Sequence, residues 1–287
     1  MIKRVIKYAA VVFAAIIIIL AVYFSFSQEA QKSSAPQSVR IPVIMYHQIS
    51  KNGKNIGRYV ISQEELEKDL IYLQKNGYET VNVKDIISYV EGEKSLPEKC
   101  VMLTFDDGYE TGFTVLYPLM QKYHMKAVVS VIGSLTELYT ENGDHNDVYS
   151  YLDEEEIRLL SESDEIEIQN HSYDMHYCQS GKRKGINKLS GESYENYKKA
   201  LTDDIGKMQT YLMSITGRKC QAMTYPFGEC CEDTLKICKS LGFKVTFTCE
   251  EKVNTLTRYR RESLYNLGRF NRSGVADRET FFKKVLT

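Results

Sequence analysis

The sequence has almost no net charge and lacks several patterns that mark common binding folds. Its 37 Lys and Arg residues against 38 Asp and Glu residues give a formal net charge of -1, so nothing in the charge favours a nucleic-acid partner. No cysteines are spaced as C-x-x-C, which argues against a structural zinc knuckle. No G-x-G-x-x-G follows a predicted strand, so dinucleotide binding has no support. We assign no disulfide among the seven cysteines.

The N-terminal segment is strongly apolar. Residues 8–26 carry no charge and are long enough to cross a bilayer, and the basic tail of residues 1–7 predicts that this end stays in the cytoplasm. A cleaved signal peptide is the alternative, although its apolar region would be shorter, about 7–15 residues. Residues 27–40 form a polar, flexible tether. We therefore expect a monomeric, single-pass plasma-membrane protein whose catalytic domain, residues 41–287, lies outside the cytoplasm, or a secreted protein if the segment is cleaved.

The rest of the chain alternates between strand-like and helix-like segments. Short apolar runs such as Ile41–Tyr46 and Cys100–Phe105 indicate buried strands. Ser62–Asn76 has a capping box followed by leucines at helical spacing. This alternation predicts an α/β fold with a mostly parallel sheet covered by helices. About seven repeats favour a closed or nearly closed β/α barrel, with a doubly wound open sheet as the alternative.

Polar side chains gather where the predicted strands end. Asp106 and Asp107 follow one strand, His171 and His176 follow another, and His47 follows the first strand of the domain. Taken singly, these are an ordinary Asp-Gly turn and unrelated histidines. The carboxyl ends of parallel strands meet at one face of a barrel, so we expect these side chains to lie together. One carboxylate with two imidazoles suits a divalent metal, and the second carboxylate is then free to act as a general base.

These motifs together resemble the polysaccharide deacetylase family of carbohydrate esterases. The resemblance rests on TFDDGY at 104–109, on His171 and His176, and on YPFG at 225–228, and it covers most of the chain from Ile41 onward. It implies a distorted β/α barrel that hydrolyses N-acetyl groups of N-acetylglucosamine polymers with a divalent metal and releases acetate. The early MYH and the five-residue histidine step are similar to the poly-N-acetylglucosamine deacetylase branch.

The resemblance also implies roles for single residues. Asp107, His171 and His176 hold one divalent ion, for which zinc is the expected metal and cobalt, nickel, iron or manganese are alternatives. Asp106 is the catalytic base. Phe227 contributes its backbone N–H to the oxyanion hole.

Two positions depart from the family pattern. The family has a late histidine as general acid, but no histidine follows His176 here, so we expect His47 to protonate the leaving amine. The arginine that often orients the base is also missing from its motif, and Arg269 or Arg272 would have to replace it. The predicted substrate contacts are Tyr109, Tyr173, Pro226 and Arg269.

Other functions stay open at this point. The polymer could be poly-N-acetylglucosamine, peptidoglycan or a chitin-like chain. Relatives with this barrel open small cyclic imides or ureides, but an outward-facing anchored domain favours a polymer. A catalytically silent, wall-binding membrane protein is the third alternative, and the presence of every residue that the metal and the base need argues against it.

Overall fold

The computed structural model describes residue 13 and residues 16–24, 37–178 and 183–286. The chain divides into two units, Met1–Gln37 and Ser38–Thr287. In the first unit, residues 16–24 are helical. The predicted basic tail lies outside the described residues, as do most of the predicted tether and the two ends of the predicted anchor. Among the described residues, no helix has both the length and the apolar character needed to cross a membrane.

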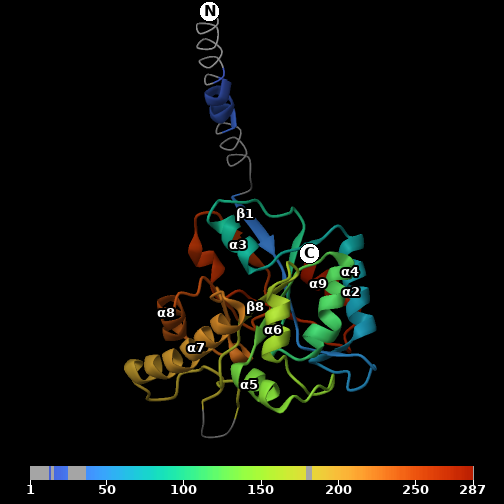
Figure 1. Cartoon of the computed structure of the whole chain (residues 1–287), viewed down its shortest axis with the longest axis vertical. Coiled ribbons are helices and arrows are strands. Elements are labelled where there is room, and N and C mark those ends of the chain that lie inside the picture. The colour runs from blue at the N-terminus through green and yellow to red at the C-terminus, as the bar shows by residue number, and fades with distance from the viewer. Residues whose placement is uncertain (1–12, 14–15, 25–36, 179–182, 287) are drawn as a thin grey trace, which may run out of the picture. The chain divides into compact units, whose positions relative to one another are not determined.

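The second unit is built around a sheet of parallel strands (Figure 1). In spatial order the strands are β10 (Val245–Phe247), β9 (Ala222–Thr224), β8 (Ile166–Asn170), β7 (Ala127–Val131), β6 (Cys100–Phe105), β2 (Val43–Tyr46) and β12 (Phe270–Asn271), and β5 (Glu79–Thr80) also pairs with β6. The predicted parallel α/β architecture is confirmed. In the described part of the chain, β10 and β12 do not pair with each other, and one bridge joins Phe247 to Leu267. The sheet is therefore a half-barrel and not a closed barrel.

Helices connect the strands and cover the sheet. They are α2 (Gln63–Lys75), α3 (Val83–Val90), α4 (Tyr117–Tyr123), α5 (Gly133–Asn142), α6 (Glu154–Ser161), α7 (Tyr194–Thr216), α8 (Glu232–Ser240) and α9 (Arg278–Leu286). Figure 1 shows α2, α4 and α9 side by side, and ring stacking of Tyr72 on Phe282 joins α2 to α9. Outside the main sheet, β1 (Ser38–Ile41) pairs antiparallel with β11 (Asn254–Thr257), and β3 (Gln48–Ser50) pairs parallel with β4 (Val60–Ser62).

The helix starts follow from local sequence. Ser62 caps α2 by accepting a hydrogen bond from the Glu65 N–H, which is one half of the predicted capping box, and the Glu65 carboxylate pairs instead with Lys68 and Arg278. Asp153 and Glu156 form a full capping box at the start of α6, which satisfies two N–H groups that a helix end leaves unpaired. The leucines of α2 are fully buried, and burying each side chain stabilises the fold by about 1.5–3 kcal/mol. Local capping and apolar spacing thus place these helices against the sheet.

Strand β6 lies in the middle of the sheet, and all six of its residues are buried. A strand covered on both faces has no room for unpaired charges. The first charged side chains therefore come directly after its carboxyl end, at Asp106 and Asp107. This is the end of the sheet at which the candidate site forms.

Candidate active site

The two carboxylates after β6 sit in a left-handed turn. Asp107 has φ 72° and Gly108 has φ 77°, a backbone region that glycine and aspartate tolerate better than most residues. A Cβ atom on Gly108 would lie 2.7 Å from Cγ1 of Val131, so the turn also requires glycine for space. In a regular strand, neighbouring side chains would point to opposite faces. The turn instead allows both carboxylates to join one buried cluster.

Asp107 meets both histidines of the predicted metal set. Its Oδ1 atom lies 3.4 Å from Nε2 of His171 and 3.3 Å from Nε2 of His176, and this buried oxygen has no hydrogen-bond partner in the described structure. Tetrahedral bonds of about 2.0–2.1 Å to a shared zinc ion would separate neighbouring ligand atoms by about 3.3–3.4 Å. The orphaned oxygen and the ligand spacing therefore fit a divalent cation.

The neighbouring backbone fixes the orientation of His171. Its Nδ1 lies 2.8 Å from the carbonyl oxygen of Thr224, which follows from β9 lying beside β8. An N–H at Nδ1 donates to this carbonyl and leaves Nε2 unprotonated and available to a metal, a common arrangement around metal-binding histidines. The position of His171 is thus set by β8, which it follows, and its ring orientation is set by the neighbouring strand β9.

The three predicted ligands shift one another's pKa values. Burial would raise the pKa of Asp107, but its contact with His171 lowers it overall. Burial would lower the pKa of His171, but its contact with Asp107 and the charges of Asp106 and Asp107 raise it overall. The pKa of His176 is lowered by burial and by the charge of His171.

Asp106 is held by a buried arginine. Nη1 and Nη2 of Arg269 lie 2.6 and 2.8 Å from the two carboxylate oxygens of Asp106, and the side chains are 0% and 3% exposed. Nε of Arg269 also donates to the carbonyl oxygen of Thr248. Arg272 instead pairs with Asp69. Of the two predicted arginines, Arg269 is the one that pairs with the predicted base. Its side chain is fully buried, which leaves no exposed atom for the predicted contact with substrate.

His47 lies in the same electrostatic environment as the two aspartates. Burial lowers its pKa, while the charges of Asp106 and Asp107 act in the opposite direction. Its Nδ1 atom is buried and has no hydrogen-bond partner in the described part of the chain. Its ring packs edge-on against Tyr59, 4.7 Å between centroids, and Tyr59 is 49% exposed. Nothing in the local sequence indicated Tyr59, because β3 and β4 bring it to His47 from a separate loop.

The turn after β9 carries Phe227 in a left-handed conformation, with φ 58°. Bulky residues rarely adopt it, and such outliers concentrate at functional sites. The Phe227 ring lies 4.5 Å from that of His176 between centroids, which places this turn beside the predicted metal ligands. Pro226 is buried within the same turn.

Tyr109 and Tyr173, the two tyrosines predicted to contact the substrate, lie in different surroundings. Tyr109 stacks on Tyr151, with 4.7 Å between ring centroids. Tyr173 is buried, its hydroxyl contacts Glu137 of α5, and Lys207 of α7 lies over its ring. Tyr173 therefore packs between helices, and little of its ring is open to a polymer.

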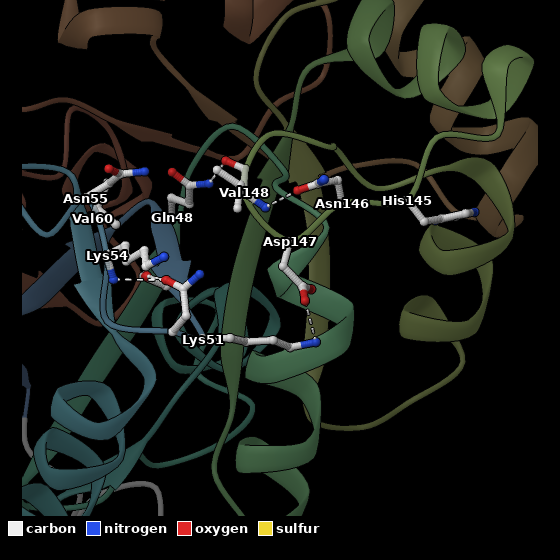
Figure 2. A pocket seen from close by; sticks show the side chains of 11 residues that line it. Gln48, Lys51, Lys54, Asn55, Val60, His145, Asn146, Asp147 and Val148 are labelled. Atoms are coloured by element: carbon white, nitrogen blue, oxygen red, sulfur yellow. Dashed lines mark hydrogen bonds and ion pairs between the residues drawn. The ribbon is translucent and has the colours of Figure 1, made fainter.

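A polar pocket of about 400 Å³ opens beside Gln48, the residue after His47 (Figure 2). Figure 2 shows Lys51 reaching Asp147 on the opposite side, where the ion pair measures 2.9 Å. The residues that line the pocket are Gln48, Ser50, Lys51, Asn52, Lys54, Asn55, Val60, His145, Asn146, Asp147 and Val148. This pocket therefore offers hydrogen-bonding groups next to the candidate site.

The family model of polysaccharide deacetylases matches residues 93–246. The chain belongs to this family. The match contains both aspartates of the DDG turn, both histidines and the Pro226–Gly228 turn. The resemblance predicted from the sequence is confirmed.

Individual relatives agree with this assignment. YxkH of Bacillus subtilis, which is named for the same family, is 29% identical over 74% of this chain and 65% of its own length. The poly-beta-1,6-N-acetyl-D-glucosamine N-deacetylase of Escherichia coli K12 is 25% identical over 72% of this chain, and the match spans only 33% of that protein. A de-N-acetylase structure from Aggregatibacter actinomycetemcomitans superposes with a TM-score of 0.71 at 23% identity, covering 86% of this chain and 100% of that one. The solved structure supports the fold.

Proposed function

We propose that the protein is a metal-dependent N-deacetylase that hydrolyses the acetamide of N-acetylglucosamine units in an extracellular polysaccharide. One observation carries the proposal. A buried, arginine-oriented carboxylate lies directly beside an Asp-His-His set of two buried residues and the partly exposed His176, and the central oxygen of this set, Asp107 Oδ1, has no hydrogen-bond partner in the described structure. A general base next to a metal set is the arrangement that amide hydrolysis requires.

Asp106 acts as the base. When bound by Asp107, His171 and His176, a divalent cation supplies Lewis-acid polarisation of the acetyl carbonyl and acidifies a water molecule. Asp106 accepts the proton of the attacking water, and Arg269 holds its carboxylate in one orientation. The backbone N–H of Phe227 donates to the oxygen that becomes negatively charged.

His47 protonates the leaving nitrogen. The C–N bond breaks with its electron pair moving to the sugar nitrogen, which takes a proton from His47. The products are acetate and a glucosamine unit in the polymer. His47 suits this role because it follows β2, which lies next to β6 in the sheet. Burial lowers its pKa, and the charges of Asp106 and Asp107 oppose that loss of proton affinity.

One observation supports poly-N-acetylglucosamine over other N-acetylated polymers, and two more support an extracellular polysaccharide in general. The Escherichia coli relative is named for that polymer. The pocket beside Gln48 is rich in amide and charged side chains, which suit hydroxyl-bearing sugars flanking the reacting unit. The apolar N-terminal run with its preceding basic residues supports a membrane anchor that places the catalytic domain outside the cytoplasm.

Acetate release from defined substrates tests the proposal. The metal-loaded full chain is incubated with poly-N-acetylglucosamine, chitooligosaccharides, peptidoglycan and a small cyclic imide, and acetate and ring opening are measured. We expect acetate from poly-N-acetylglucosamine at the highest kcat/KM. Ring opening without acetate release would identify the small-molecule hydrolase instead, and no turnover of any substrate by metal-loaded protein would favour the silent wall-binding protein.

A further inference from the structure

Glu110, His145 and Glu156 form a second cluster of metal-ligating side chains that shares no residue with the first. One ligand atom from each of the three lies within 4.8 Å of the others. Nδ1 of His145 is 2.9 Å from Oε1 of Glu110. Both carboxylates belong to buried residues, whereas His145 is about half exposed. The cluster can therefore be reached from solvent on its imidazole side.

Backbone pairing brings this cluster together. The N–H of Glu110 donates to the carbonyl oxygen of Ser150, and the N–H of Leu152 donates to that of Gly108. The segment before α6 thus lies alongside the DDG turn. Figure 2 shows the side chain of His145, one of the residues that line the polar pocket, extending away from Gln48 and Lys51.

The cluster has an unsatisfied ligand. Oε2 of Glu110 is buried without a hydrogen-bond partner in the described structure, and the residue is only 4% exposed. A buried carboxylate oxygen without a partner is costly and calls for an ion or water that satisfies it. Glu156 is the second buried carboxylate of the cluster. Burial raises its pKa to about 7, and the charges of Asp153 and Glu110 act in the same direction. The negative charge of Glu156 is therefore poorly compensated by its surroundings.

We propose that Glu110, His145 and Glu156 bind a second divalent cation. Asp153 is available as a fourth ligand, since its Oδ2 lies 3.7 Å from Nε2 of His145. Imidazole together with carboxylates favours ions such as zinc, iron and nickel over calcium and magnesium, which prefer oxygen ligands alone. The ion would link α6 to the turn that carries Asp106 and Asp107. This inference does not depend on the proposed deacetylase activity.

Counting bound ions tests the second site. The full chain, solubilised and stripped of metal, is equilibrated with zinc, freed of unbound ion and analysed for zinc per chain. We expect His145→Gln and Glu110→Gln each to bind one ion fewer than the unchanged protein. His176→Ala should also bind one fewer, and His176→Ala with His145→Gln two fewer. The matched control is Glu155→Gln, which removes the same charge from an exposed position of α6 and should lose none.

The variants distinguish loss of the second ion from misfolding and from loss of the ion at the first site. His145 is about half exposed, so its replacement should leave the circular dichroism spectrum unchanged even if Glu110→Gln unfolds. A folded His145→Gln protein that binds as many zinc ions as the unchanged chain would overturn the proposal. Replacement of the second ion by calcium at equal concentration would overturn the assigned class of metal.

Discussion

The guanidinium of Arg269 and the carboxylate of Asp106 form a two-pronged ion pair that is closed to solvent. Arg269 comes from the segment just before β12, 163 positions after Asp106 in the sequence. Burial alone would raise the pKa of Asp106, but the charges of Arg269 and His171 hold it well below its usual range. The ion pair therefore favours the ionised form of Asp106 and holds its carboxylate in one orientation.

Replacing Arg269 should shift the pH dependence of activity as well as the stability. In Arg269→Gln, burial would dominate and the pKa of Asp106 would rise, so the acid limb of kcat/KM should move to higher pH. Leaving one charge of a buried pair unpaired costs about 3–5 kcal/mol. Urea unfolding and pH-rate profiles measure the two effects. In the unchanged protein, the lowered pKa makes Asp106 stabilising above its unfolded pKa of about 3.9. That contribution is lost as the pH falls toward the folded value.

Arg272 provides the matched comparison. It is also buried and also paired with an aspartate, Asp69, which contacts Arg278 as well. Arg272→Gln should lower the free energy of unfolding by a smaller amount, because Arg278 still pairs with Asp69, and it should leave the acid limb of kcat/KM in place. If both arginine variants move the acid limb equally, Arg269 has no specific role in positioning Asp106.

Asp106→Asn should separate catalysis from metal binding. The amide keeps the size of the side chain but cannot accept the proton of the attacking water, and Asp107, His171 and His176 stay unchanged. We expect acetate release to be abolished while zinc per chain stays near that of the unchanged protein. Turnover at the unchanged rate in this variant would show that another group is the base.

His47→Gln tests the general acid. General acid catalysis contributes about 10²–10⁴-fold, so kcat should fall by that range while zinc binding persists. Burial lowers the pKa of His47 below its ordinary 6.5, and the acid role needs the protonated ring. In the unchanged protein kcat/KM should therefore decline as the pH rises through this lowered value, and the variant should lack this alkaline limb. A loss of less than about tenfold would place the acid elsewhere.

The sequence predicted those parts of the site that depend on local motifs. The DDG turn, the histidine pair and the Pro226–Gly228 turn each follow a strand directly, so strand prediction was enough to place them at one end of the sheet. The partner of Asp106 could be narrowed only to Arg269 or Arg272, because ion pairing across the barrel depends on the register of β12. The cluster around Glu110 was missed for the same reason, since it depends on pairing between Glu110 and Ser150.

For the fold as well, local patterns could be predicted from the sequence and long-range strand pairing could not. Alternating apolar segments predicted the parallel sheet and its helices, because burial of each segment is a local pattern. Two other features depend on which strands from distant parts of the sequence pair with each other. They are the gap between β10 and β12 and the antiparallel pairing of β1 with β11. Composition and spacing carry no information on that choice.

The stability gained from metal gives a test of the first site that does not require substrate. A ligand that binds only the folded state stabilises it by about 2.7 kcal/mol at a free concentration of 100 times its Kd. In His176→Ala the set loses one of three ligands, so the zinc-dependent gain in unfolding free energy should shrink and acetate release should stop. The control is His124→Asn, an exposed histidine in a left-handed helix cap where asparagine is tolerated. It should keep both the zinc-dependent gain and the activity. An unchanged zinc-dependent gain in folded His176→Ala would exclude His176 as a ligand.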